Sequence, residues 1–383
     1  MYKIIRVTTI PKSLGGLLKG QLKFISQYYE VLGISGKGGD RLERISKEEG
    51  IKVIPVEMTR KITPIQDLKA VYQLYKIFRK ERPDIVHSHT PKAGTLSMIA
   101  AKLAGVPHRL HTIAGLPLLE ARGSKRKLLD VVEKVTYRCA TMIYPNSFGL
   151  KDIIIQNKYT KKEKLKVIAN GSSNGIDTSF FDPAKYSNEE NLKLRKELNI
   201  SSSDIVFIFL GRLVKDKGIN ELIVAFKELN QEHSNCKLLL VGIFENELDP
   251  LLPETNHEIE TNPNIIFAGW QNDVRPYFAI SDILTFPSYR EGFPNVVMQA
   301  ASMGLASIVT DINGCNEIIR EGENGLIVPV KDERALLESL RRLVNDREYR
   351  DSLAANARES IVNRYKNDYV WNELLKEYKS LTD

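Results

Sequence analysis

Gly211-Arg212-Leu213-Val214-Lys215-Asp216-Lys217-Gly218 is the stretch that decides the fold of this chain. An apolar run at residues 205–210 precedes it and predicts a buried strand, and apolar residues recur at helical spacing over residues 219–229. A strand, a glycine turn and a helix N-terminus together favour a diphosphate site, because main-chain N–H groups and the positive end of the helix dipole face the anion. Arg212 and Lys217 add two full positive charges to that site.

The segment Glu291-Gly292-Phe293-Pro294-Asn295 repeats this design. A predicted strand at residues 282–286 leads into the acidic turn, and a helix is expected from about Asn295. Ligands of open parallel sheets bind at the carboxyl ends of the strands. Two strand-turn-helix sites in one half of the chain therefore predict a nucleotide-activated ligand held at the edge of a parallel sheet.

Size and composition indicate a globular enzyme of two domains. The chain has 383 residues, of which 42% are hydrophobic and 27% charged. No apolar run approaches the roughly 18 residues of a membrane-spanning helix. Lys3 and Arg6 interrupt the apolar N-terminus, which predicts a first strand rather than a signal peptide. The cysteines are odd in number and far apart, as is typical of reduced thiols in a cytoplasmic protein: Cys139, Cys236 and Cys315.

The net charge of +7 calls for an anionic partner or a purely structural explanation. No nucleic-acid-binding motif accompanies the charge, so no nucleic acid partner is expected. An anionic membrane face and a phosphorylated substrate fit equally well. Part of the excess lies in Arg-Gly-Ser-Lys-Arg-Lys at residues 122–127, before an amphipathic segment at residues 128–139. That segment is either a solvated helix start or a patch that contacts the membrane.

Strands and helices alternate along almost the whole chain, which predicts an α/β protein with doubly wound parallel sheets. Helices are expected between the strands, for example at residues 66–80 and 94–104. The predicted strands lie at residues 3–8, 29–35, 52–56, 84–88, 108–113, 141–144 and 166–169, and then at 205–210, 237–241, 265–268, 282–286, 306–310 and 325–328.

A change in residue composition marks the expected domain boundary. Residues 170–183 are rich in turn-forming residues and separate the two alternating series. We expect a first domain at residues 1–180, a second at residues 181–365, and a C-terminal helix at residues 366–383 that returns to the first domain.

Five motifs resemble those of glycosyltransferase family 4. They are Gly-Arg-Leu-x4-Gly with its lysine, Glu-Gly-Phe-Pro-Asn, Asn-Gly-Ile-Asp at residues 174–177, Gly-Cys-Asn-Glu at residues 314–317 and Asn-Gly-Leu-Ile-Val at residues 324–328. The likeness covers essentially the whole chain and is greatest to members that build bacterial surface polysaccharides. It implies the GT-B fold, two Rossmann-like domains facing a central cleft, with the acceptor on the first and the nucleotide sugar on the second.

The resemblance also implies roles for single residues. Arg212 and Lys217 would hold the donor diphosphate, where two fixed cations stabilise the departing negative charge without a metal ion. Glu291 would contact the donor sugar and face positive charge at the anomeric carbon. The alternatives are a surface ion pair with Asp216 for the two cations and an N-cap carboxylate for Glu291. The other expected donor-binding residues are Gly15, Gly16, Gly211, Gly292, Phe293, Pro294, Asn295 and Gln299.

Gln299 departs from the family pattern, which has a glutamate there that grips both ribose hydroxyls. A glutamine can still accept one hydrogen bond from a hydroxyl and donate another, but it cannot form the two charge-assisted hydrogen bonds of a carboxylate. Ala114 stands where the family shows the histidine of Thr-x-His-Gly. We therefore hypothesise a donor that lacks the hydroxyl bound by that histidine, such as a 6-deoxy sugar; a preference for UDP-glucose over every 6-deoxy donor would refute this.

Weaker signals mark further residues. Gly15 and Gly16 are expected in a glycine turn after the first strand, although an ordinary strand-helix turn is a close alternative. His87 and His89 lie on one face of a strand but have no third ligand nearby, so no metal site is expected. The candidate cleft-lining residues are His89, His111, Trp270, Gln271 and Glu317.

The resemblance thus implies a retaining, metal-independent glycosyltransferase of the hexosyl or N-acetylhexosaminyl type. The expected donor is a nucleoside-diphosphate sugar, with UDP favoured, and the expected acceptor is a polyprenyl-diphosphate-linked oligosaccharide. No metal or other cofactor is expected, and the location is cytoplasmic, with the inner membrane's cytoplasmic face as a candidate contact. Two alternatives stay open: a sugar-nucleotide epimerase of the same fold, and a non-catalytic sugar-nucleotide-binding scaffold.

Overall fold

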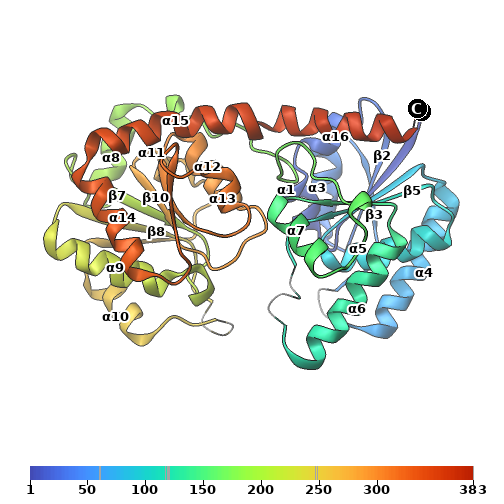
Figure 1. The fold of residues 1–383 in the computed structure, drawn as a ribbon. Coiled ribbons are helices and arrows are strands. Elements are labelled where there is room, and N and C mark those ends of the chain that lie inside the picture. Colours follow the sequence, from blue (N-terminus) through green and yellow to red (C-terminus); the bar gives the residue numbers. More distant parts are fainter. Residues whose placement is uncertain (60–61, 117, 119–120, 246, 248, 383) are drawn as a thin grey trace. The chain divides into compact units, whose positions relative to one another are not determined.

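The structure is a computed structural model that describes residues 1–59, 62–116, 118, 121–245, 247 and 249–382 (Figure 1). It divides into two compact units. Unit 1 comprises Met1–Gly175 with Asn367–Asp383, and unit 2 comprises Ile176–Lys366. The chain therefore leaves unit 1 after residue 175, where the sequence placed the boundary at 180, and returns after residue 366, where it placed the boundary at 365.

Unit 1 is built on a sheet of six parallel strands in the order β3-β2-β1-β4-β5-β6. All described neighbours pair in parallel register, for example Ile4 with Val31 and Ile85. The strands are β1 (Lys3–Val7), β2 (Glu30–Ser35), β3 (Lys52–Pro55), β4 (Ile85–His89), β5 (His108–Ile113) and β6 (Met142–Pro145).

The strand predicted at residues 166–169 is wrong. Leu165 forms one isolated bridge with Ile143, and the chain then leaves the sheet. Ala169 has a φ of 53°, a left-handed conformation that no strand accommodates. The main-chain N–H of Lys166 donates to the Ile143 oxygen of β6, and the Lys166 side chain pairs with Glu377 of the C-terminal helix.

Helices cover both faces of this sheet. Two apolar clusters lie on opposite faces: one packs α4, α5, α6 and α7 onto the strands, and the other packs α1, α2, α3 and α16. The helices are α1 (Pro11–Leu17), α2 (Gln21–Ile25), α3 (Asp40–Glu49), α4 (Pro64–Glu81), α5 (Pro91–Leu103), α6 (Gly123–Cys139), α7 (Phe148–Gln156) and α16 (Asn367–Thr382).

Unit 2 contains a second parallel sheet, in the order β12-β11-β10-β7-β8-β9. Apart from the edge strand β9, its strands are mostly buried and apolar, as expected for a sheet covered on both faces. They are β7 (Ile205–Leu210), β8 (Cys236–Val241), β9 (Ile265–Gly269), β10 (Ile283–Phe286), β11 (Ala306–Thr310) and β12 (Gly325–Val328).

The helices of unit 2 follow the strands in alternation and then close the unit with two long helices. They are α8 (Asn188–Glu197), α9 (Ile219–Glu232), α10 (Pro253–Thr261), α11 (Arg275–Ala279), α12 (Asn295–Ser302), α13 (Cys315–Ile318), α14 (Glu333–Asn345) and α15 (Arg347–Tyr365). Within the described part of the chain, no helix is both long and apolar enough to cross a bilayer.

The two sheets share one strand order, which fixes where a ligand site is expected. Numbered within each unit, both sheets run 3-2-1-4-5-6, so the strand order reverses between the first and fourth strands. In such sheets the crevice at the carboxyl ends of those two strands receives the ligand. The switch points are β1 and β4 in unit 1, and β7 and β10 in unit 2.

Candidate active site

Gly211–Gly218 lies at the switch point of unit 2, directly after β7. Residues 215–217 form a single 3-10 turn, and Gly218 starts α9 with a φ of 69°. A Cβ atom on Gly218 would lie 2.1 Å from the main-chain oxygen of Pro287, which follows β10. Only glycine therefore lets α9 begin this close to the neighbouring strand, and the N-terminus of the helix is brought to the crevice.

Lys217 and Glu291 form an ion pair at this edge. Their side chains are 16% and 20% exposed, so the pair is largely shielded from solvent. The hydroxyl of Ser288 donates to Glu291 Oε1 at 3.2 Å, and Lys217 Nζ lies 5.6 Å from the centre of the Phe286 ring. The predicted diphosphate lysine and the predicted sugar-facing carboxylate, 74 residues apart in sequence, thus meet at one point.

Arg212 is held separately, by Glu245 after β8. Its Nη1 lies 2.5 Å from Glu245 Oε2, and about half of the Arg212 side chain is exposed. Asp216, the partner expected under the surface ion-pair alternative, pairs instead with Arg290. Because Arg212 is half exposed and its partner is an accessible carboxylate, exchange of that partner for a phosphate oxygen needs no rearrangement of the core.

The acidic turn Glu291–Asn295 is braced by the loop after β11. Asn313 Nδ2 donates to the main-chain oxygen of Glu291 at 3.0 Å. Gly314 approaches so closely that a Cβ atom there would lie 2.7 Å from the main-chain oxygen of Gly292. Phe293 is buried against Tyr365, with ring centres 5.3 Å apart. The turn is therefore fixed on both sides.

The predicted donor-binding residues of this turn differ in burial. Phe293 and Pro294 are buried and hold the turn, whereas Asn295 is exposed at the start of α12. No side-chain hydrogen bond caps the N-terminus of α12, so its first main-chain N–H groups remain oriented outward from the helix end. Gln299, half-buried, lies one turn further along the same face of α12 as Asn295.

The candidates Trp270, Gln271 and Glu317 lie on other loops of unit 2. Trp270 and Gln271 follow β9, the edge strand of the sheet; Trp270 is 63% exposed, and Gln271 Nε2 donates to the main-chain oxygen of Ala268 at 2.7 Å. Glu317 lies in the short helix α13, where its main-chain oxygen accepts a hydrogen bond from the Tyr365 hydroxyl at 2.9 Å. Burial beside this helix raises the pKa of the Cys315 thiol well above its ordinary value, so that thiol stays protonated.

Gly15 and Gly16 do not form the predicted glycine turn. Both lie inside α1, which starts at Pro11. A Cβ atom on Gly15 would approach Ile45 of α3 to 2.7 Å, so this glycine permits close helix packing. Gly16 faces open space. Pro11 at the first helical position starts the helix earlier than the sequence interpretation allowed.

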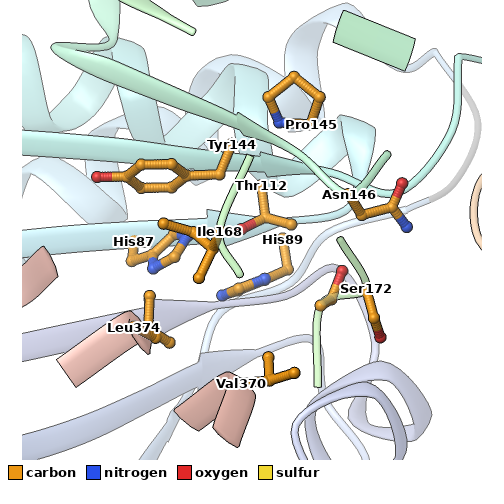
Figure 2. Close-up of a pocket in the computed structure, with 11 residues that line it drawn as sticks. His87, His89, Thr112, Tyr144, Pro145, Asn146, Ile168, Ser172, Val370 and Leu374 are labelled. Atoms are coloured by element: carbon orange, nitrogen blue, oxygen red, sulfur yellow. Dashed lines mark hydrogen bonds between the residues drawn. The ribbon is translucent and has the colours of Figure 1, made fainter. Parts of the chain in front are cut away.

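His89 lies at the end of β4 beside His87, with ring centres 4.3 Å apart, at the switch point of unit 1 (Figure 2). Burial lowers the pKa of both imidazoles well below 6.5, so both are neutral at pH 7. The cavity they line measures about 20 Å³, which holds about one water molecule. Its walls are His87, His89, Thr112, Tyr144, Pro145, Asn146, Ile168, Ser172, Ser173, Val370 and Leu374.

His87 is a packed residue: its Nδ1 contacts the Tyr378 hydroxyl at 2.5 Å and its Nε2 the Thr112 hydroxyl at 2.7 Å. His111, by contrast, corrects the prediction of a cleft-lining residue. It is 3% exposed and covered by α5, where a Cβ atom on Gly94 would lie 2.2 Å from its ring. Burial lowers the His111 pKa to about 4. Ala114, just beyond β5, is exposed.

Arg6 is a buried residue at the switch point of unit 1 that the sequence interpretation missed. It is 0% exposed, and its Nε and Nη2 lie 3.1 and 2.9 Å from His89 Nε2. Its Nη2 also donates to Gln21 Oε1 at 2.5 Å. A lone arginine in the middle of an apolar strand is the signal that could have pointed to this network, because such a charge requires buried partners.

Two family models match the chain. One, described as glycosyl transferase 4-like, matches residues 18–147, and the other, described as glycosyl transferases group 1, matches residues 190–360. The capsular polysaccharide biosynthesis glycosyltransferase CapM of Staphylococcus aureus is 35% identical over 379 residues, covering 99% of this chain and 97% of CapM. The chain belongs to glycosyltransferase family 4.

Further similarities agree with this glycosyltransferase assignment. The UDP-Gal:alpha-D-GlcNAc-diphosphoundecaprenol alpha-1,3-galactosyltransferase of Escherichia coli is 31% identical over 316 residues, covering 80% of this chain and 78% of the relative. The crystal structure of Anabaena HepE in complex with UDP aligns with a TM-score of 0.81 at 20% identity, covering 99% of this chain and 100% of HepE. The fold is the predicted GT-B fold. The protein is an enzyme, a glycosyltransferase, and the epimerase alternative is not supported.

Proposed function

We propose that this glycosyltransferase moves a sugar from a UDP-sugar to a polyprenyl-diphosphate-linked acceptor in the synthesis of a bacterial surface polysaccharide. Three similarities support the proposal. The S. aureus relative is named for capsular polysaccharide biosynthesis, and the E. coli relative for a UDP-galactose donor and a diphosphoundecaprenol-linked acceptor. The HepE structure, similar in fold, holds UDP. The reaction would take place in the cytoplasm, at the cytoplasmic face of the inner membrane.

The observation that carries the proposal is the Lys217–Glu291 pair at the switch point of unit 2. A diphosphate placed there meets Lys217, the N-terminus of α9 and, once it releases Glu245, Arg212. Two cations beside the leaving group stabilise its growing negative charge, so no metal ion is needed for that purpose. The donor would bind to unit 2 and the acceptor to unit 1.

Glu291 and Lys217 would then have complementary tasks in the transfer. The bond between the anomeric carbon and the diphosphate oxygen breaks, and a bond from the acceptor hydroxyl oxygen to the same carbon forms. Attack from the side of the leaving group retains the anomeric configuration, and the departing phosphate oxygen takes the acceptor's proton. Glu291 offers negative charge to the electron-poor anomeric carbon, while Lys217 stabilises the phosphate.

The proposal is tested by a transfer assay on the purified protein in the presence of EDTA. UDP-galactose, UDP-N-acetylglucosamine and 6-deoxy UDP-sugars are offered with a synthetic polyprenyl-diphosphate-GlcNAc, and the anomeric configuration of the product is read by NMR. Retained configuration in a lipid-linked product is the expected result. Transfer only from a GDP- or ADP-sugar would contradict the UDP-sugar donor. An inverted product would contradict the retaining mechanism, and activity only with added metal would contradict metal-independent transfer.

A further inference from the structure

Two helices of unit 1, α4 and α6, expose apolar stripes of the same spacing. On α4 the stripe is Ile65, Leu68 and Tyr72, with exposed fractions of 73%, 71% and 59%. On α6 the stripe is Leu128, Val131 and Val135, with exposed fractions of 48%, 57% and 41%. Positions i, i+3 and i+7 lie on one face of a helix, so each set forms a continuous strip.

The charges beside these stripes are of one sign. All residues of α4 and α6 are described, and every exposed charged residue on the two helices is basic. The acidic residues of the two helices are partly buried. Asp67 pairs with Lys92, Glu81 with Lys3 and Asp130 with Arg126, and Glu133 is also partly buried. The exposed cations are Lys69, Lys76, Arg79 and Lys80 on α4, and Lys125, Lys127, Lys134 and Arg138 on α6, with Arg122 just before it.

An ordinary surface helix of the same protein looks different. Helix α14 in unit 2 has a strongly amphipathic sequence but buries its leucines, and it exposes Glu333 and Glu338 together with Arg334 and Arg342. It exposes no large apolar side chain. The combination of exposed apolar residues and single-sign charge therefore distinguishes α4 and α6 from α14.

The two stripes belong to one layer of unit 1. Helix α5 packs between α4 and α6, and the three cover the same face of the sheet (Figure 1). Both α4 and α6 follow strands of the parallel sheet, so their first turns start at its carboxyl edge. Ile65 and Leu68 lie in the first two turns of α4, and the cations at residues 122–127 lie at the start of α6.

We propose that the exposed face of α4 and α6 docks on an anionic lipid bilayer, with the two apolar stripes entering the interface and the surrounding lysines and arginines contacting acidic headgroups. Aliphatic and tyrosine side chains in the interface, flanked by cations, are the pattern of a helix that lies on a membrane rather than across it. Lys76 Nζ lies 4.7 Å from the centre of the Tyr72 ring, so a cation and an aromatic residue meet at this face.

The inference rests on the proposed function in one respect, since a membrane at this face would bring lipid-linked acceptors to the carboxyl edge of the unit 1 sheet. The binding itself can be tested without nucleotide or acceptor. The full-length protein is sedimented with vesicles of pure phosphatidylcholine, or of phosphatidylcholine with 30% phosphatidylglycerol, at low and high salt. We expect binding only to the anionic vesicles and a loss of binding as salt increases.

Two double variants separate the contribution of the cations to vesicle binding from that of the apolar residues. Lys127→Glu with Lys134→Glu should reduce binding to anionic vesicles by at least tenfold, because each cation near such a surface contributes roughly a fivefold factor. Leu68→Ser with Val131→Ser should reduce binding to the anionic vesicles at low salt, because it removes apolar contact with the interface and leaves the charges unchanged. The matched control is Lys193→Glu with Arg334→Glu in unit 2, which changes the net charge equally and should bind like the wild type.

Circular dichroism melting confirms that each variant folds. Equal binding to neutral and anionic vesicles, or wild-type binding by both unit 1 variants, overturns the inference. The inference would also be overturned if the protein does not bind vesicles but forms a dimer that Leu68→Ser with Val131→Ser abolishes. In that case the face binds a second copy of the chain. Vesicle binding by a protein that binds no nucleotide would keep this inference and contradict the proposed function instead.

Discussion

The ammonium group of Lys217 lies against the carboxylate of Glu291, at the point where β7 and β10 end side by side. Each charge holds the other in the crevice while no ligand is bound. A diphosphate would compete with Glu291 for Lys217 and leave the carboxylate free to face the sugar. In the proposed reaction the pair would therefore link binding of the leaving group to placement of the carboxylate that faces the anomeric carbon.

Replacing Lys217 by alanine should impair both UDP binding and turnover. It removes the shielded cation beside the diphosphate, so we expect kcat to fall by about 10²–10³-fold and the Kd for UDP to rise. Steady-state kinetics and calorimetry check both. Lys215→Ala, which removes an exposed lysine two residues away, is the matched control and should change neither by more than about twofold.

Glu291→Gln should separate binding from catalysis. Glutamine keeps the size of the side chain but removes the negative charge, so kcat should fall while the affinity for UDP stays the same or increases, because Lys217 no longer has an anionic partner. The measurements are kcat and the Kd for UDP. A loss of UDP affinity with unchanged kcat would instead make Glu291 a positioning residue for the turn.

Gly218→Ala should destabilise unit 2. The substitution imposes a left-handed conformation on alanine and places its Cβ 2.1 Å from the Pro287 oxygen, so we expect a loss of about 2–4 kcal/mol in the free energy of unfolding. Gly269→Ala is the control: its φ of 68° is nearly the same, but nothing lies within 4 Å of the added atom. Urea unfolding should show the smaller loss, about 1 kcal/mol, for the control. Equal losses would mean that the contact with Pro287 is unimportant.

Unit 1 should lose stability as the pH falls from about 6.5 to about 4. Burial lowers the folded-state pKa of His111 from 6.5 to about 4, so between these values the unfolded chain binds a proton that the folded chain does not. Stability is fully present above pH 6.5 and decreases below it, by about 2 kcal/mol for this one residue between pH 7 and pH 5.

Urea unfolding at pH 7 and pH 5 measures this effect. His111→Asn should show a smaller difference between the two pH values than the wild type. His257→Asn replaces an exposed histidine in unit 2 and should leave the difference unchanged. An identical pH dependence in His111→Asn and wild type would contradict the assignment.

The parts of the structure that depend on local sequence could be predicted. The turn at Gly211–Gly218 and the turn at Glu291–Asn295 each follow an apolar strand and precede a helix, and their residue types fit only that geometry. The alternation of strands and helices predicts parallel sheets, but it does not give the strand order, because more than one doubly wound topology fits it. The resemblance to family 4 then supplied roles that spacing alone does not give.

The parts that depend on distant partners could not be predicted. Glu245 as the partner of Arg212, and Asn313 as the support of Glu291, come from loops that no periodicity connects. The burial of Arg6 with His89 needs the pairing of β1 with β4. Gly15 was misassigned because a glycine pair indicates a turn in sequence, whereas here Ile45 of a packed helix requires the missing side chain.

The most direct test of the central claim is calorimetric titration of the protein with UDP, GDP and ADP in the presence of EDTA, repeated with Arg212→Ala. The account predicts selective binding of UDP that needs no metal ion and that weakens strongly in Arg212→Ala. Selective binding of GDP or ADP would contradict the donor class, and UDP affinity unaffected by the loss of Arg212 would contradict the diphosphate site at Gly211–Gly218.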